Sequence, residues 1–274
     1  MRYHAIVLTV IFILFSCKKE QIPAAGPITV TGVKHILLKD ISIPNLPSPY
    51  YHFEYNSDSL VTNVNFASGY TNYDVLYNGN KITEMRNNIF VNHDTLRYTY
   101  DNTGKLSMIK FINGANVIFR VVFFTYDGNL IKKIEWDQKD GNTGYRVDRT
   151  LSFTFYSDGN VQTITEHRPP IPGVDDYISV KTFEQYDDKI NVDDFSLIHD
   201  GIHDHLFLPQ GFRLQKNNPR KEKFSVNGSD YYSINYTYIY NSDHTPSDKA
   251  GDFIYLSGSS AGQIFRTDSF YSYY

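Results

Sequence analysis

Short runs in which apolar and polar residues alternate, separated by turn-forming residues, make up most of the chain. In the clearest unit, Tyr98 and Tyr100 precede the turn sequence Asp-Asn-Thr-Gly, and Leu106 and Ile109 follow it. A spacing of two places both tyrosines on the same face of a strand. Asp, Asn and Gly supply the side-chain hydrogen bonds and the positive φ angle that a tight turn needs. This unit therefore predicts a β-hairpin.

The same unit recurs along the chain as a degenerate repeat. In its full-length copies, apolar residues follow the aromatic residue by six and by nine positions. Simple alternation does not explain that change of parity, so we expect a β-bulge in the second strand of each hairpin. Consecutive hairpins predict an all-β fold, a large antiparallel meander that forms a curled sheet or a barrel-like roll. The copies begin at Tyr55, Tyr77, Tyr100, Tyr126, Phe155, Tyr186 and Tyr240.

The first residues depart from this pattern. Ala5–Phe15 is an unbroken apolar run of eleven residues, which is too short to span a bilayer and suits the hydrophobic region of a signal peptide. The segment Leu14-Phe15-Ser16-Cys17 resembles the sequence that lipoprotein signal peptidase recognises. By that resemblance, residues 1–16 are a signal peptide of the lipoprotein type, and Cys17 becomes the N-terminus and carries acyl chains. The alternative is a secretory signal with a chance cysteine, but Cys17 is the only cysteine of the chain and lipidation accounts for it.

The rest of the chain divides into a tether and a single domain. Residues 17–29 comprise the lipidated N-terminus and a tether of mixed charged, Pro, Ala and Gly residues. We expect residues 30–274 to form one all-β domain, with an insertion at about 191–227 where the interval between repeat copies doubles. The 23 tyrosines and 19 phenylalanines favour strands as well.

The charge balance bears on the partners of the protein. The formal net charge is −4, and the only basic cluster, Arg220-Lys221-Glu222-Lys223, is short and interrupted by an acid. Nucleic-acid binding requires clustered Lys and Arg, so we expect no nucleic-acid partner. The expected partners are a membrane, through the N-terminal lipid, and a glycan or an envelope protein.

The repeats also resemble known families. The Tyr-Asp-x-x-Gly-x-Leu units resemble the tyrosine–aspartate repeats of bacterial toxin and teneurin shells. More closely, residues 50–274 resemble a family of Bacteroidota lipoproteins that carry a domain of unknown function described as porin-like in fold. In the C-terminal part this resemblance depends on residues 216–220, 236–243 and 270–274. It departs at His244-Thr245-Pro246, where those relatives often have Gly-Tyr-Pro.

This resemblance implies a cellular location but no catalytic activity. It implies lipid attachment at the outer membrane. Lys18-Lys19-Glu20 resembles, in part, the export signals of surface lipoproteins, which slightly favours the cell surface over the periplasmic side. It brings no catalytic residues, because the family has no assigned activity, and a porin-like fold on a lipid-anchored chain need not form a pore.

The strongest candidate for metal chemistry is a histidine cluster within the expected insertion. His199, His203 and His205 lie among several carboxylates, and these residue types bind zinc and other divalent metals. The spacing matches no metalloenzyme motif that we can name, and a polar loop explains it better. The sequence also lacks a nucleophile elbow, a P-loop and a dinucleotide fingerprint. We therefore expect no metal, no cofactor and no enzymatic activity.

Two further sets of residues are candidate sites. Trp136 and Tyr145 flank a long polar hairpin loop that could present their rings to a glycan, although Trp136 packed in the sheet is the alternative. Asp58-Ser59-Leu60 and Asp94-Thr95-Leu96 resemble a short O-glycosylation sequence of exported Bacteroidota proteins, which makes Ser59 and Thr95 candidate acceptors.

Three functions are compatible with these features. The favoured one is a non-catalytic cell-envelope lipoprotein that binds or presents a ligand, with a glycan as the candidate. The second is a periplasmic carrier or chaperone of lipid or outer-membrane components, which a continuous exposed apolar concavity would favour. The third is an envelope hydrolase with a dispersed site, which convergent carboxylates or histidines in a pocket would favour.

Overall fold

The computed structural model describes residues 36–89, 93–141, 144–198, 206–209 and 212–274. Among these residues no helix is long and apolar enough to cross a membrane. They contain sixteen β-strands and the short 3-10 helices η1 (Ala67–Gly69) and η2 (Phe195–Ile198). The strands are β1 (Leu38–Ser42), β2 (Tyr51–Tyr55), β3 (Val61–Phe66), β4 (Thr71–Asn78), β5 (Lys81–Asn87), β6 (Thr95–Tyr100), β7 (Leu106–Ile112), β8 (Ile118–Asp127), β9 (Leu130–Asp140), β10 (Gly144–Phe155), β11 (Val161–Arg168), β12 (Tyr177–Tyr186), β13 (Pro219–Val226), β14 (Ser229–Tyr240), β15 (Pro246–Tyr255) and β16 (Ile264–Tyr273).

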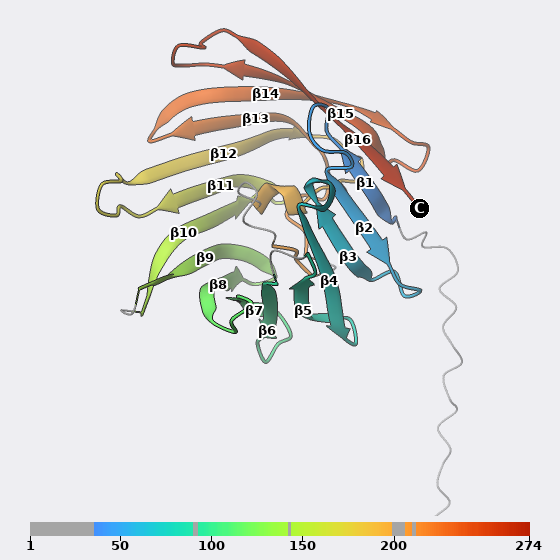
Figure 1. The fold of residues 1–274 in the computed structure, drawn as a ribbon. Coiled ribbons are helices and arrows are strands. Elements are labelled where there is room, and N and C mark those ends of the chain that lie inside the picture. Colours follow the sequence, from blue (N-terminus) through green and yellow to red (C-terminus); the bar gives the residue numbers. More distant parts are fainter. Residues whose placement is uncertain (1–35, 90–92, 142–143, 199–205, 210–211) are drawn as a thin grey trace, which may run out of the picture. The chain divides into compact units, whose positions relative to one another are not determined.

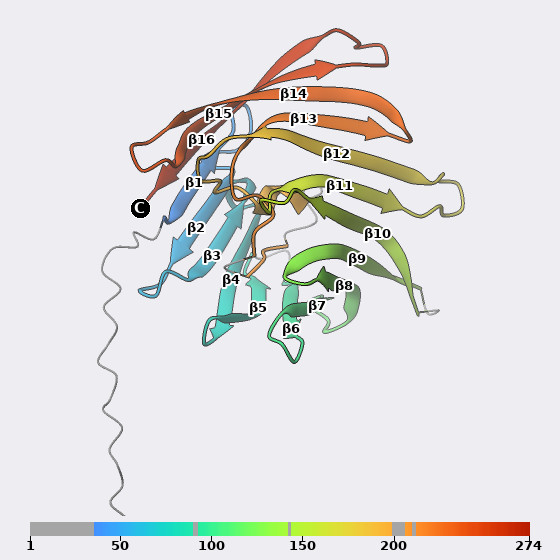
Figure 2. The ribbon, with the colours of Figure 1, turned by 180° about the vertical axis from the view of Figure 1, so that it is seen from behind.

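The sixteen strands form a closed antiparallel barrel. Each strand pairs with the next along the chain, and β16 pairs back onto β1, so the sheet has no free edge (Figures 1 and 2). The expected all-β meander of hairpins is confirmed. Of the two expected forms, a curled sheet and a barrel-like roll, the closed sheet is the roll. The wall is taller on one side, because β10 and β14 have 12 residues each whereas β1 and β2 have 5.

Six of the seven repeat hairpins contain the expected bulge; the copy at Tyr186 pairs β12 with β13 without a register shift, so the expectation is wrong there. Tyr100 pairs with Leu106 and Thr99 pairs with Met108, so Ser107 on the second strand has no ladder partner. The Ser107 hydroxyl donates a hydrogen bond to the Thr99 carbonyl at 3.0 Å, so this carbonyl oxygen has a partner next to the bulge. The same register shift occurs in the hairpins β2–β3, β4–β5, β8–β9, β10–β11 and β14–β15.

The bulges explain why the repeat aromatic residue is usually tyrosine. The Tyr100 hydroxyl donates to the carbonyl of Ile82 at 3.0 Å, and Ile82 is the first bulge residue of the preceding hairpin. Each of these bonds ties one hairpin to the next and satisfies a carbonyl at a bulge. The other bonds of this kind run from Tyr126 to Leu106, from Tyr186 to Val161 and from Tyr273 to Pro246.

We expect Tyr100→Phe to lower the free energy of unfolding by about 0.5–1.5 kcal/mol, because it removes one hydrogen bond of a half-buried carbonyl. Chemical denaturation of the full chain measures this change. Tyr70→Phe is the control, since the Tyr70 side chain is 53% exposed and its loss should change stability by less than about 0.5 kcal/mol.

The reciprocal substitution tests the same bond. Phe155 occupies the repeat position on β10, and the bulge residue on the preceding strand β9 is Ile131. Phe155→Tyr supplies the missing hydroxyl and should raise the free energy of unfolding by up to about 1 kcal/mol. Equal stability of the Tyr100→Phe variant and the wild type would show that these hydroxyls do not hold the hairpins together.

The described residues of the segment between β12 and β13 (187–198, 206–209 and 212–218) contribute to the core inside the barrel. This segment, residues 187–218, is named the plug here; the expected insertion at 191–227 overlaps it, but residues 219–226 form β13. The η2 helix lies inside the ring of strands in both views (Figures 1 and 2). The Tyr98 hydroxyl donates to the Phe207 carbonyl at 2.6 Å. Plug residues buried in the same core as the inward side chains of the wall are Phe195, Ile198, Leu206, Leu208 and Leu214.

The outer surface of the barrel is polar. Glu84 lies between Arg86 and Arg97, at 2.6 Å and 3.0 Å, and Glu184 pairs with Lys223 at 2.8 Å. Apolar side chains such as Phe123 and Ile239 are scattered among these charges. A transmembrane barrel shows the opposite arrangement, with an apolar band outside and a polar interior. The described wall therefore has the polarity of a barrel surrounded by water.

Candidate functional site

Charged side chains replace apolar ones on the inner wall above the plug. On β11 the side chains that face the interior are Ile164, Glu166 and Arg168, each two positions from the next. On β12 the corresponding side chains are Phe183, Lys181 and Ser179. The spacing of two keeps each series on the inner face of its strand. These residues form what we name the inner-wall site: Arg146, Arg149, Glu166, Arg168, Tyr177, Ser179 and Lys181.

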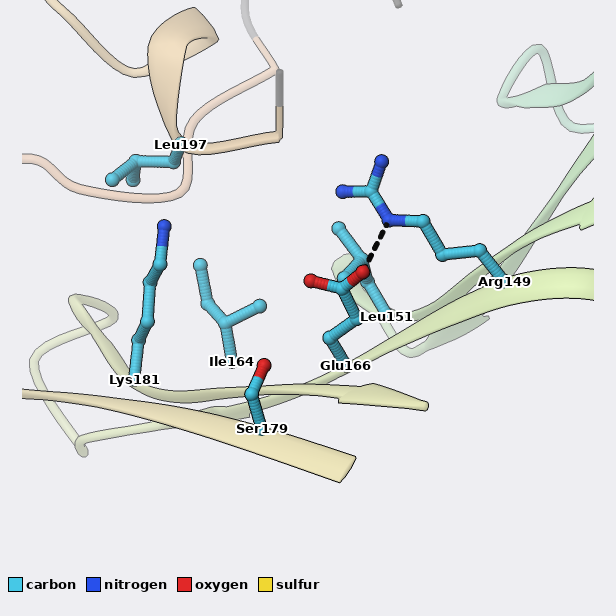
Figure 3. A pocket seen from close by; sticks show the side chains of 7 residues that line it. All are labelled: Arg149, Leu151, Ile164, Glu166, Ser179, Lys181 and Leu197. Atoms are coloured by element: carbon cyan, nitrogen blue, oxygen red, sulfur yellow. Dashed lines mark ion pairs between the residues drawn. The ribbon is translucent and has the colours of Figure 1, made fainter. Parts of the chain in front are cut away.

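The deeper part of this site is a cavity of about 60 Å³. Figure 3 shows the Glu166 carboxylate, the Ser179 hydroxyl and the Lys181 ammonium group around this space, with Leu197 of the plug across it. Leu151 and Ile164 form the apolar part of the lining. The strands and the plug therefore build this cavity together.

Two guanidinium groups share the carboxylate of Glu166. Its Oε1 atom lies 3.2 Å from Nε of Arg149 and 2.6 Å from Nε of Arg168. The guanidinium carbon of Arg149 also lies 4.6 Å from the centre of the Trp136 ring, a cation–π contact that packs Arg149 against the core. Lys181 forms no ion pair within the described residues. The inner-wall site thus holds more positive than negative charge around the deep cavity.

A second, wider cavity lies on the same three strands, towards the loops that join β9 to β10 and β11 to β12. Its volume is about 440 Å³, within the range of ordinary small-ligand sites. The Arg168–Glu166 pair separates it from the deep cavity, because Glu166 lines one and Arg168 lines the other. The lining residues of this outer cavity are Arg146, Asp148, Arg168, Pro169, Ile171, Val174, Asp175 and Tyr177.

Aromatic rings continue the inner wall beyond β12. Phe224, the register partner of Lys181, stacks on Tyr232 with ring centres 4.7 Å apart, and Tyr232 lies 4.2 Å from Phe253. Below them, Glu222 is buried and accepts a hydrogen bond of 2.8 Å from the Tyr236 hydroxyl. The tall side of the barrel thus has a charged part on β10–β12 and an aromatic part on β13–β15.

The structure does not bring the two expected glycan-binding residues together. Trp136 is 1% exposed and its ring is covered by Arg149, because the position faces inward and the long hairpin does not lift it into the loop. Its ring therefore belongs to the core, and the expectation that Trp136 faces a ligand is corrected. Tyr145 lies near the tip of the hairpin, 46% exposed, and its hydroxyl donates to the Ile118 carbonyl.

The other expected sites fall in different places. Ser59 lies in the β2–β3 turn with a φ of 62°, and Thr95 begins β6 near the opposite end of the barrel. Cys17 and the histidines His199, His203 and His205 lie outside the described residues. Within the residues that are described, no group of three or more His, Cys, Asp or Glu side chains is placed to hold a metal ion.

Sequence reasoning missed the inner-wall site, although a signal was present. In the run Ile164-x-Glu166-x-Arg168, charged residues continue the phase of an inward apolar residue. A charge at such a position is costly unless it is paired or meets a ligand. The spacing of two from the apolar Ile164 identifies Glu166 and then Arg168 as inward residues. The same spacing from the inward Phe183 identifies Lys181.

The plug carries two buried carboxyl groups. Burial raises the pKa of Asp194 to about 7, and it raises the pKa of the neighbouring Asp193 as well. The backbone N–H of Gln215 donates to Asp194 Oδ1 at 2.9 Å. The plug therefore favours the protonated form of Asp194 in the folded state.

We expect the protein to lose stability as the pH rises from about 4 to about 7. Over this interval the folded chain binds a proton at Asp194 that the unfolded chain has released, because the folded pKa is the higher one. Asp194→Asn should flatten the curve of melting temperature against pH. Asp188→Asn is the control, since the pKa of Asp188 is lowered by Lys189 and its titration falls below this interval. A slope that survives Asp194→Asn unchanged would contradict the assignment.

Solved structures that resemble the barrel include two porin-like proteins. A porin-like protein from Bacteroides vulgatus superposes with a TM-score of 0.56 at 14% identity, covering 87% of this chain and 99% of that one. A porin-like protein from Bacteroides uniformis gives a TM-score of 0.55 at 13% identity, covering 82% of this chain and 89% of that one. The fold is porin-like. At such identities the likeness concerns the fold alone.

No family model matches the sequence, and no curated protein matches it.

Proposed function

We propose that this chain is a non-catalytic, lipid-anchored protein of the cell envelope that binds a ligand in the inner-wall site, with a glycan as the candidate ligand. The observation that carries the proposal is the pair of adjacent cavities above the plug, lined by Arg146, Arg168 and Lys181. A ligand in a concave site with a few convergent polar groups is the usual arrangement for small-molecule binding.

The plug favours a binder over a carrier of lipid. A carrier needs a continuous apolar concavity, whereas the apolar inward positions of the described wall pack against plug residues such as Ile198 and Leu214. The hydrolase alternative receives no comparable support, because the carboxylate of Glu166 is held by two arginines. Both guanidinium groups occupy the carboxylate, and no second carboxylate lines the deep cavity among the described residues.

The location is part of the same proposal. Acyl chains on Cys17 would hold the chain at the outer membrane, and the sequence after Cys17 slightly favours the cell surface. The polar exterior, with Glu84 and Glu184 in ion pairs, supports a barrel that is surrounded by water and joined to the membrane only through the N-terminal tether. In this proposal the porin-like barrel binds a ligand in its interior and forms no pore.

A glycan array tests the binding function. The full chain, purified in detergent, is expected to bind at least one neutral or acidic oligosaccharide on the array. Tyr177→Ala, in the outer cavity, should weaken that binding, whereas Ile178→Ala, the adjacent residue of β12 that is 40% exposed, should leave it unchanged. Equal loss in both variants, or no bound glycan at all, would overturn the proposal.

A further inference from the structure

Lys181 has no anionic partner among the residues that the structure describes. Its ammonium group reaches the deep cavity beside Leu151, Ile164 and Leu197, and Figure 3 shows it directed towards Leu197. No described carboxylate forms an ion pair with it, because the Glu166 carboxylate is bound by Arg149 and Arg168. Lys181 is half-buried at this position, and a bound anion would supply the ion pair that the described residues do not.

The deep cavity defines the size and charge of that anion. Among the described lining residues, Arg149 and Lys181 carry two positive charges and Glu166 carries one negative charge, so their net charge is positive and favours an anionic ligand. The volume of about 60 Å³ admits a small group such as a carboxylate or a sulfate. The hydroxyl of Ser179, which faces the same cavity, is an additional hydrogen-bond donor.

The outer cavity defines what the anionic group is attached to. Donors and acceptors both line it, with Arg146 and Arg168 among the donors and Asp148 and Asp175 among the acceptors. Tyr177, one proline and two aliphatic residues supply apolar contact. A sugar ring has hydroxyls that donate and accept together with an apolar C–H face, and it matches this lining. An acyl chain would need an apolar channel, which the plug occupies.

We propose that the ligand is an acidic saccharide whose carboxylate or sulfate group enters the deep cavity at Lys181 while its sugar ring occupies the outer cavity. This inference rests on the proposed binding function and adds the chemical class of the ligand. The Arg168–Glu166 pair lies at the boundary of the two cavities, so both parts of one ligand would contact it.

Titration calorimetry on the full chain in detergent tests this inference. The probes are uronate-containing, sulfated and uncharged oligosaccharides of matched length, together with vesicles of an anionic phospholipid. Acidic oligosaccharides are expected to bind, and the affinity should fall with added salt. Lys181→Gln should weaken binding by roughly tenfold to a hundredfold, the cost of losing a hydrogen bond to a charged group. Lys181→Arg should restore part of it.

Lys110→Gln is the matched control, because Lys110 lies on the outer face of β7, where its register partner is the outward Arg97. Its affinity should equal that of the wild type. Binding of uncharged oligosaccharides that depends on Tyr177 and ignores Lys181 would overturn the acidic class and leave the binding function in place. Lys181-dependent capture of the anionic vesicles alone would identify a lipid headgroup and overturn the saccharide. The absence of any oligosaccharide binding would overturn both proposals.

Discussion

Leu214→Ala is expected to lower the free energy of unfolding of the whole barrel by about 2–5 kcal/mol. Leu214 belongs to the plug, is completely buried, and packs in the same core as the inward side chains of the wall. Its carbonyl also accepts a hydrogen bond of 2.9 Å from the backbone N–H of Val161, at the start of β11. Truncation leaves a cavity between plug and wall that the closed sheet cannot collapse to fill. Urea denaturation of the full chain measures the effect.

Leu130→Ala is the matched control for this prediction. Leu130 begins β9 and is 40% exposed, so its truncation should cost less than about 0.5 kcal/mol. Similar effects of the two substitutions would mean that the plug does not pack inside the barrel. In that event, the deep cavity, which Leu197 helps to close, would lose its basis as well.

Glu166→Ala is expected to destabilise the barrel by about 3–5 kcal/mol, because it leaves Arg149 without its carboxylate. Arg149 is 6% exposed and lies against Trp136, so its charge cannot turn to solvent without disturbing the core. Melting temperature and urea denaturation both report this change. The substitution should also abolish ligand binding, since Glu166 positions both arginines of the inner-wall site.

A surface ion pair supplies the comparison. Glu135 pairs with Lys133 at 2.9 Å on the outer face of β9, and Glu135→Ala should cost about 0–1 kcal/mol. Adding Arg149→Met to Glu166→Ala removes the buried charge that Glu166 had balanced and should recover most of the lost stability. If the double variant were as unstable as the single one, the loss would come from packing and the ion pair would not be its cause.

The hairpins and their bulges were predictable because their determinants are local. The aromatic pair Tyr98/Tyr100, the turn at Gly104 and the parity change at Leu106 lie within a dozen residues. Closure of the barrel was not predictable in the same way. It depends on pairing between β1 and β16, with Ile41 opposite Tyr271, and no short-range pattern specifies a contact between residues so far apart in the sequence.

The inner-wall site was harder to predict than the fold, for two physical reasons. The interior of the barrel depends on where the plug goes, and the composition of residues 187–218 does not reveal that Ile198 and Leu214 enter the core. A position next to a polar loop is also a poor guide to exposure. Trp136 precedes a polar hairpin tip, but the alternation of side chains along β9 directs its ring into the barrel, where Arg149 covers it. Strand phase, which links Ile164 to Glu166 and Arg168, is the better signal.

The central proposal is that lipid alone holds a water-surrounded barrel to the membrane, and fractionation of cells tests it most directly. Residues 1–17 are replaced by a cleavable signal peptide that leaves no cysteine, and cell membranes are washed with alkaline carbonate. The wild-type chain should stay with the membranes, whereas the variant should be found in the soluble fraction and still unfold cooperatively. A variant that stays in the washed membranes would show that the barrel wall itself enters the bilayer, and would contradict both the polar exterior and the role of Cys17.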